Sequence, residues 1–266
     1  MYVTSRTCRL GPVATDDFDN DAQLDIVVVS GFDQSVDVLL GYGHLDFSSR
    51  TKLIIEDDAQ PRAFATTDFN NDHQTDIVVV CSGVNKMNIF LGYANGYFAN
   101  QTAHATGSFP SSVATEDFNN DIYIDIIVAN FHSNNLGVFH GYGNGSFTNQ
   151  TIYNTYFGAQ FVVMPDFNND LFLDIIMTIP DTNTVSILPG YGDGTFGDLL
   201  KFQLKYGSLP LSVCIGDFNN KKNEILPLSM KPQTVYKFIC KRVDILYSNV
   251  TIFLSFICCI IILLSV

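Results

Sequence analysis

The amino-acid sequence predicts an all-β protein: a β-propeller or partial propeller of about four four-stranded blades plus a degenerate fifth, with a C-terminal hydrophobic helix. Three observations lead to this prediction. Two short strings recur together about every fifty residues, each repeat contains several short β-branched runs, and no repeat shows helical spacing of its apolar residues. With 266 residues, 47% of them hydrophobic, the chain can bury a substantial core, which excludes a disordered protein.

The first string, Asp-Phe-(Asp/Asn)-Asn, is called the Asp string and begins at Asp17, Asp68, Asp117, Asp166 and Asp217. The second, Gly-Tyr-(Gly/Ala)-X-X-X-Phe, is called the Gly-Tyr string and begins at Gly41, Gly92, Gly141 and Gly190. In all four complete copies the second string starts 24 residues after the first. Repeats are therefore expected at about 11–60, 61–109, 110–158 and 159–209, with a partial copy at 210–220, so that the repeat region spans 11–220.

Each repeat carries signals for four strands. A nearly continuous apolar run follows the Asp string, as at 26–29, and such runs are typical of strands covered on both faces. An alternating segment such as 36–40 predicts the second strand. A third strand is expected to start at the Phe of each Gly-Tyr string, and a fourth precedes the Asp string, as at 112–115. Four strands per repeat favour a propeller over a solenoid, whose units are shorter.

The charge distribution divides the chain and excludes one class of partner. The whole chain has 27 acidic residues against 14 Lys and Arg, a net charge of −13, so no basic surplus exists to neutralise nucleic-acid phosphates. Residues 1–220 hold 25 of the acids and 8 of the bases, whereas residues 221–266 hold two acids and six bases. The acidic repeats therefore end near 220, and a basic linker is predicted at 221–244.

The Asp string opens a nine-residue loop in which oxygen-bearing side chains recur at positions 1, 3, 5 and 9. Such spacing can wrap a loop around one hard cation, with the main-chain carbonyl of position 7 as a further ligand, and Ca²⁺ takes six to eight oxygens of this kind. No soft ligand is present for zinc or copper. The predicted ligands, of about four Ca²⁺ ions, are Asp17, Asp19, Asp21, Gln23 and Asp25; Asp68, Asn70, Asp72, Gln74 and Asp76; Asp117, Asn119, Asp121, Tyr123 and Asp125; and Asp166, Asn168, Asp170, Phe172 and Asp174.

The distribution of carboxylates supports this prediction. The four loops hold 13 acids, and the remaining 14 acids equal the number of Lys and Arg, so the net charge resides formally in the loops. Carboxylates crowded in this way repel one another unless a cation lies among them. The alternative, that Asp and Asn merely form turns, does not explain why position 9 is Asp in all four loops. An EF-hand is excluded because position 12 is Val or Met instead of Glu.

The Asp-X-(Asp/Asn)-X-Asp-X-X-X-Asp loop, coupled to the Gly-Tyr string, resembles the FG-GAP/VCBS repeat family, which includes the propeller of integrin α subunits. The resemblance covers about residues 11–220. It implies a seven-bladed propeller in a complete member, calcium in loops on one rim, and a role in extracellular adhesion or recognition. Four units leave three alternatives open: a closed four-blade ring, an open arc, or a fragment of a longer protein.

The sequence departs from the family pattern in two places. Position 6, often Gly in the family, is Ala22, His73, Ile122 and Leu171, and a left-handed backbone there costs roughly 1–2 kcal/mol. The fifth copy has Lys221 at position 5 and Ile225 at position 9, so no metal is expected there.

The tail at 245–266 contains 22 residues without a charge, long enough at about 1.5 Å per residue to span a hydrocarbon core of about 30 Å. A membrane helix is predicted, with an off-frame or intron-derived tail as the alternative. Basic residues before the tail favour a cytosolic body. Weak calcium loops and sequons at Asn100, Asn144 and Asn149 favour an extracellular one, which is the location expected. The first nine residues contain no readable secretory signal.

Two functions are compatible with these features. The first is a non-catalytic adhesion or recognition module, tethered to a membrane, that binds a protein or glycan ligand. The second is a propeller-fold carbohydrate-active enzyme, a lyase or glycosidase with an axial active site. Catalysis would need polar residues that break the repeat symmetry, and the candidates are His44, His104, His132, His140 and Glu56. None has a spacing that indicates a mechanism, so the chain is expected not to be an enzyme.

Overall fold

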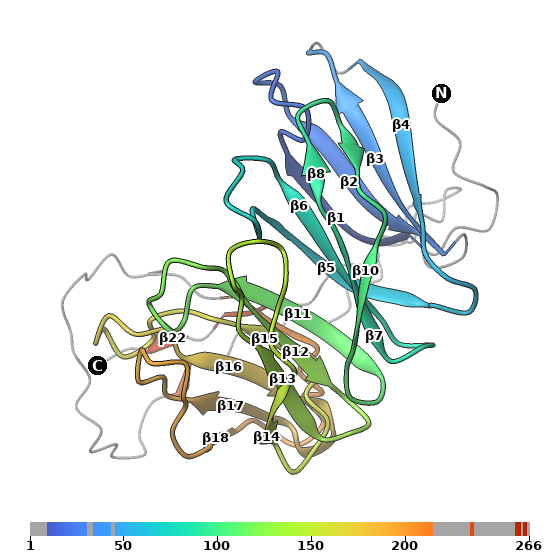
Figure 1. The fold of residues 1–266 in the computed structure, drawn as a ribbon. Helices are drawn as coiled ribbons and strands as arrows, with labels where there is room; N and C mark the ends of the chain where they lie inside the picture. The colour runs from blue at the N-terminus through green and yellow to red at the C-terminus, as the bar shows by residue number, and fades with distance from the viewer. Residues whose placement is uncertain are drawn as a thin grey trace, which may run out of the picture. The chain divides into compact units, whose positions relative to one another are not determined.

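The computed structural model describes residues 10–30, 34–43 and 46–214, together with the short segments 235–236, 259–261 and 263–264. The described residues form an all-β fold with four four-stranded antiparallel sheets and only one short 3₁₀ turn (Figure 1). The chain divides into two compact units, residues 1–159 and 160–266.

The first unit contains three of the four-stranded sheets. The strands of the first sheet follow chain order: β1 (Leu10–Asp16), β2 (Asp25–Ser30), β3 (Ser35–Gly41) and β4 (Phe47–Ile54). The second sheet comprises β5 (Pro61–Thr67), β6 (Asp76–Cys81), β7 (Lys86–Phe90) and β10 (Thr102–Ala105), in that spatial order. The third comprises β11 (Pro110–Glu116), β12 (Asp125–Asn130), β13 (Asn135–Phe139) and β14 (Thr151–Asn154). A small hairpin, β8 (Gly92–Tyr93) with β9 (Tyr97–Phe98), belongs to the second repeat.

The three sheets pack face to face, with strands β1, β5 and β11 in contact in that order. Strand β6 shows why the apolar runs do not alternate with polar residues, since all six of its residues are buried. Ile77 and Val79 join a core cluster with residues of the first sheet, whereas Val78 and Val80 join a cluster with residues of the third. The strand is therefore covered on both faces, as blades packed on one another require.

The second unit contains the fourth sheet, with β15 (Phe161–Val163), β16 (Ile175–Ile179), β17 (Thr184–Leu188) and β18 (Leu200–Gln203), and a 3₁₀ turn at Pro180–Thr182. Strand β19 (Ser212–Cys214) contacts β15 and β16, and its Val213 joins their core cluster. It also pairs in parallel with β21 (Cys259–Ile261), while β20 (Val235–Tyr236) pairs with β22 (Leu263–Leu264).

One strand prediction needs correction. The outer strand starts at the Phe of the Gly-Tyr string only in the first repeat, at Phe47; in the others it starts at Thr102, Thr151 and Leu200. The Phe pairs with the Gly of its own string in every repeat, within β3–β4 in the first and through β8–β9 or single bridges in the others. In the second, third and fourth repeats three residues separate this Phe from the outer strand, so the pairing closes a small hairpin before that strand begins.

Most of the predicted C-terminal segments lie outside the described residues. This holds for the fifth loop from 217 onward, for the linker at 221–244 except β20, and for the hydrophobic stretch at 245–266 except β21 and β22. Those five residues of the stretch are assigned to strands. Among the described residues, no helix is long and apolar enough to cross a membrane.

Candidate metal centres

The carboxylate at position 1 organises each nine-residue loop by accepting two main-chain hydrogen bonds. In the second loop, Asp68 Oδ1 accepts from the N–H of Asp72 at 3.2 Å, and Oδ2 accepts from the N–H of His73 at 2.7 Å. Asp72 Oδ1 in turn accepts from the N–H of Gln74 at 2.9 Å. The same three bonds recur in the other loops, at similar distances. The Asp residues therefore curl the chain around the side chains of positions 1, 3 and 5.

Two residues of every loop adopt the left-handed backbone conformation. At position 4 the residue is always Asn, with φ between 58° and 60°. At position 6 the φ values are 65° for Ala22, 63° for His73, 71° for Ile122 and 74° for Leu171. The strain expected from non-Gly residues at position 6 is thus present in all four loops, and it is greatest for the β-branched Ile122.

The carboxylate at position 9 joins the two sequence strings. Asp76 is fully buried; its Oδ2 accepts a hydrogen bond from the N–H of Phe69 at 2.8 Å, and its Oδ1 accepts one from the N–H of Gly92 at 2.7 Å. Asp25 and Asp174 make the same pair of bonds, and Asp125 Oδ1 bonds to the Gly141 N–H. These hydrogen bonds from position 9 to both strings are called the bracket. The bracket explains the constant distance of 24 residues between the strings.

Burial of the bracket carboxylates has an electrostatic cost. It raises the pKa of Asp76 to about 6, although the N–H groups of Gly92 and Phe69 act in the opposite direction. Burial also raises the pKa of Asp25 and of Asp174 above the ordinary value for Asp. Nearby carboxylates of the same loop contribute to each of these pKa shifts. A cation among these groups would remove the repulsion.

The first loop brings three predicted ligands to one point. Asp17, Asp19 and Asp21 each place a carboxylate oxygen within 4.8 Å of the others. Two oxygens bound to the same Ca²⁺ at about 2.3–2.6 Å are at most about 5.2 Å apart, so the spacing suits one ion. Burial, followed by the charges of Asp25 and Asp21, raises the pKa of Asp19. Asp25 itself does not belong to this group of three.

The other three loops have Asn at position 3, and its amide turns back onto the loop. The Nδ2 groups of Asn70, Asn119 and Asn168 donate to the carboxylates at position 5 at 3.0, 3.0 and 2.8 Å. Rotation of the amide by half a turn would present its oxygen instead, and a calcium ion would require that orientation. These loops hold the predicted residues of positions 1, 3 and 5 close together with one carboxylate fewer than the first loop.

Position 7 contributes to the loop through its main-chain N–H, as described above for Gln74, and through contacts between loops. Gln74 Oε1 accepts a hydrogen bond from Asn20 Nδ2 at 2.7 Å, which joins the first loop to the second. The corresponding residues Gln23, Tyr123 and Phe172 donate their N–H groups to position 5 of their own loops.

His140 is a neighbour of the third loop that the repeat pattern did not assign to it. Its Nδ1 lies 3.5 Å from Asp125 Oδ2 and 3.4 Å from Asn119 Nδ2. The interaction with the Asp125 carboxylate raises the pKa of His140 above its ordinary value. The signal was available in the sequence, because the residue before the Gly-Tyr string is Leu40, Leu91 or Pro189 in the other repeats.

The remaining symmetry-breaking candidates make structural contacts. The His104 ring lies edge-on to Phe139 and Phe147, and His132 stacks on Phe109 with ring centroids 4.3 Å apart. Glu56 forms an ion pair with Lys86 at 2.8 Å, in the turn region before β5. His44 lies outside the described residues.

Fold and loops together define a class of protein: a repeat protein built from four-stranded β-sheets, each carrying one oxygen-rich loop. The model of the FG-GAP-like repeat matches this chain four times, at residues 17–79, 68–128, 117–177 and 166–220. The chain therefore belongs to the family of FG-GAP-like repeat proteins, which confirms the resemblance predicted from the two strings. Among curated proteins, no sequence matches the chain.

Solved structures with a similar fold have little sequence in common with the chain. A putative 6-phosphogluconolactonase from Bacteroides uniformis is 12% identical, with a TM-score of 0.58, over 77% of this chain and 57% of that one. Virginiamycin B lyase from Staphylococcus aureus is 13% identical, with a TM-score of 0.52, over 77% and 64%. A lectin from Agrocybe aegerita that recognises non-reducing terminal N-acetylglucosamine is 17% identical, with a TM-score of 0.51, over 70% and 50%.

The chain thus spans less than two thirds of the length of these three proteins. At these identities the similarity shows the fold alone, and that fold is a repeat β-propeller. The all-β propeller-like architecture predicted from the sequence is confirmed at this level.

Proposed function

We propose that this chain is a calcium-binding, non-catalytic recognition module whose repeats present loops to a protein or glycan ligand. The observation that carries the proposal is the convergence of Asp17, Asp19 and Asp21 within 4.8 Å, in a loop whose backbone path recurs in every repeat. When bound, Ca²⁺ would supply charge neutralisation and fix the loop. The residues that would hold it are the side chains of positions 1, 3 and 5.

The structure supports a refinement of the ligand set. The position-9 carboxylates were predicted as ligands, but in the first, second and fourth loops both of their oxygens accept main-chain N–H groups. A carboxylate has about four acceptor sites, so contact with an ion is compatible with the bracket. We therefore assign position 9 first to closing the loop and second to the ion, and expect the first loop to bind most tightly because it has the most carboxylates.

Titration calorimetry of the full chain with CaCl₂ tests this proposal. About four ions should bind, and Asp21→Asn should remove about one of them because a carboxylate at position 5 is lost. Asp57→Asn provides the matched control, since Asp57 is an exposed acid in a turn outside the loops. Absence of calcium binding, or equal stoichiometry in Asp21→Asn and the unchanged protein, would refute the ligand assignment.

The non-catalytic part of the proposal rests on the arrangement of acids. Cleavage of a glycosidic bond uses two carboxyl groups about 5–10 Å apart. The two cavities found between the first and second sheets are lined by a single acid, Asp19, among the described residues. The lyase, the putative lactonase and the lectin above all have a similar fold, and of these three the lectin is the one that recognises a glycan.

Membrane tethering through 245–266 and an extracellular location complete the proposal. Three exposed sequon residues, Asn100, Asn144 and Asn149, lie on the repeats. Full-length protein expressed in a secretory cell line should resist alkaline carbonate extraction and should shift in gel mobility on treatment with an N-glycosidase. Release by carbonate would refute the tether, and an unshifted band would refute the location.

A further inference from the structure

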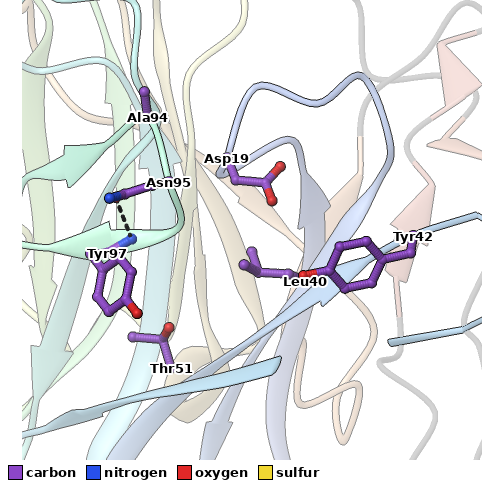
Figure 2. A pocket seen from close by; sticks show the side chains of 7 residues that line it. All are labelled: Asp19, Leu40, Tyr42, Thr51, Ala94, Asn95 and Tyr97. Carbon is purple, nitrogen blue, oxygen red and sulfur yellow. Dashed lines mark hydrogen bonds between the residues drawn. The ribbon is translucent and has the colours of Figure 1, made fainter. Parts of the chain in front are cut away.

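A polar hollow lies between the first and second sheets, within the first unit. It has a volume of about 490 Å³ and is lined by Asp19, Leu40, Tyr42, Thr51, Ala94, Asn95 and Tyr97 (Figure 2). The size falls in the range of small-molecule sites, about 300–1,000 Å³. The first sheet and its loop supply Asp19, Tyr42 and Thr51, and the hairpin β8–β9 of the second repeat supplies the opposite wall.

The floor of the hollow is held rigidly. Gly96 is buried with a φ of 71°, and a Cβ at this position would lie 2.6 Å from a methyl group of Leu40. Thr51 Oγ1 donates a hydrogen bond to the carbonyl oxygen of Gly96 at 3.1 Å. These contacts fasten the hairpin to the first sheet, so the hollow exists before any ligand binds.

The walls combine aromatic faces with groups that accept hydrogen bonds. Tyr42 and Tyr97 are 53% and 64% exposed, and Figure 2 shows the Asp19 carboxylate pointing into the space between the two walls. Asp19 Oδ1 accepts the N–H of Asp21 at 3.3 Å. A carboxylate has about four acceptor sites, so Asp19 can accept further hydrogen bonds from a ligand in the hollow.

The chemistry of the lining selects one class of ligand. Among the described residues no Lys, Arg or His lines the hollow, so the described lining offers no cationic partner for a phosphate or carboxylate. The apolar part of the lining consists of Leu40, Ala94 and the two Tyr rings, which is too little for a lipid chain. A neutral sugar fits both parts, because its hydroxyl groups can donate to Asp19 while its C–H face packs on a Tyr ring.

Comparison among the repeats shows that this lining is specific to the first pair of sheets. The position of Tyr97 in its Gly-Tyr string is occupied by Ser146 in the third repeat and Thr195 in the fourth. The position of Asp19 is occupied by Asn in the other three loops, where the amide is bonded back to position 5. The second Tyr and the Asp19 carboxylate therefore occur together in this hollow and break the repeat symmetry.

We propose that the hollow is a binding site for a neutral saccharide, which stacks on Tyr97 and Tyr42 and donates hydroxyl hydrogen bonds to Asp19. This inference deepens the proposed recognition function and rests on it. The site needs no ion in order to form, because its floor depends on Leu40, Thr51 and Gly96.

Saturation-transfer NMR on the detergent-solubilised full chain tests the site with glucose, galactose, mannose and N-acetylglucosamine as probes. At least one sugar should bind, and Tyr97→Ser should raise its Kd by about five- to tenfold through loss of one aromatic contact. Tyr97→Ser should preserve folding because Ser146 occupies the same position in the third repeat. Tyr142→Ala is the matched control, since Tyr142 is equally exposed at 58% but lies outside the hollow.

Each outcome of this experiment either supports or refutes the saccharide site. If none of the four sugars binds, or if Tyr97→Ser and Tyr142→Ala bind equally well, the saccharide site is refuted. Binding of ethylamine without any sugar would also refute it and would indicate a cationic ligand on Asp19. The same sample is titrated with CaCl₂: calcium binding without sugar binding leaves the calcium proposal intact, and sugar binding without calcium binding refutes only the latter.

Discussion

Replacement of Asp76 by Ala isolates the structural role of the position-9 carboxylate. Asp76 is fully buried, and its two oxygens accept the N–H groups of Phe69 and Gly92 at 2.8 and 2.7 Å. In Asp76→Ala both N–H groups lose their partner in a place where water cannot replace it. The link between the Asp string and the Gly-Tyr string of the second repeat is then broken.

The size of the effect follows from these two bonds. A buried donor left unsatisfied costs about 1–3 kcal/mol, so the two together cost roughly 2–6 kcal/mol. Part of this is offset because the variant no longer buries a carboxyl group whose pKa is raised to about 6 by that burial. We expect a net loss of about 2–3 kcal/mol in the free energy of unfolding.

The assay is urea unfolding followed by circular dichroism, with excess EDTA present so that lost calcium contributes nothing. Asp72→Asn is the matched comparison from the same loop, because an Asn at position 5 keeps an oxygen for the N–H of Gln74. In EDTA, Asp72→Asn should unfold within about 0.5 kcal/mol of the unchanged protein. In CaCl₂, Asp72→Asn should lose stability relative to the unchanged protein, since a ligand is missing.

The reasoning fails if Asp76→Ala loses less than about 1 kcal/mol in EDTA, or if Asp72→Asn loses as much as Asp76→Ala under that condition. The first result would mean that position 9 stabilises the loop only through a metal ion, and the second would mean that its two hydrogen bonds matter no more than the carboxylate at position 5.

Three further predictions concern calcium, pH and backbone strain. Excess EDTA should lower the melting temperature of the calcium-loaded full chain by several degrees, and an unchanged melting curve would exclude structural calcium. Burial lowers the pKa of His104, so the contribution of this residue to stability is present above its unfolded pKa and is lost as the pH falls through its folded pKa. The variant His104→Phe, which copies Phe202 at the same register, should therefore lose less stability than the unchanged protein between about pH 7 and pH 5. Urea unfolding at each pH measures this difference, and parallel pH profiles of the two proteins would contradict the prediction. Leu171→Asn should raise the free energy of unfolding by about 0.5–1 kcal/mol because Asn tolerates the left-handed backbone at this position. Tyr206→Asn is the control, since Tyr206 is also highly exposed, and it should not raise stability. Equal effects of the two substitutions on the melting temperature would contradict the strain argument.

Much of the fold was predictable because every repeat contains the same sequence signals for the same strands. The constant spacing of the two strings predicted the repeat length, and the apolar runs predicted strands buried on both faces, as β6 and β12 are. The start of the outer strand was not predictable, since Phe47 and Phe147 both pair with the Gly of their own string, yet only Phe47 continues directly into the outer strand.

The candidate metal centres were also predictable only in part. Oxygen ligands at positions 1, 3 and 5 follow from spacing, and the structure places those of the first loop together. The bracket role of Asp76 could not be inferred, because its partner N–H at Gly92 lies 16 residues away and any residue except Pro offers the same donor. The hollow beside Asp19 could likewise not be predicted, since its walls come from two different repeats.

The bracket also determines where this chain can change length. Between a Gly-Tyr string and the following Asp string the separation varies, with 27 residues from Gly41 to Asp68 but 25 from Gly92 to Asp117. Within the bracketed segment it does not vary. Foreign peptides or affinity tags should accordingly be grafted into the turns that lead from one sheet to the next, where the sequence itself already accommodates two extra residues.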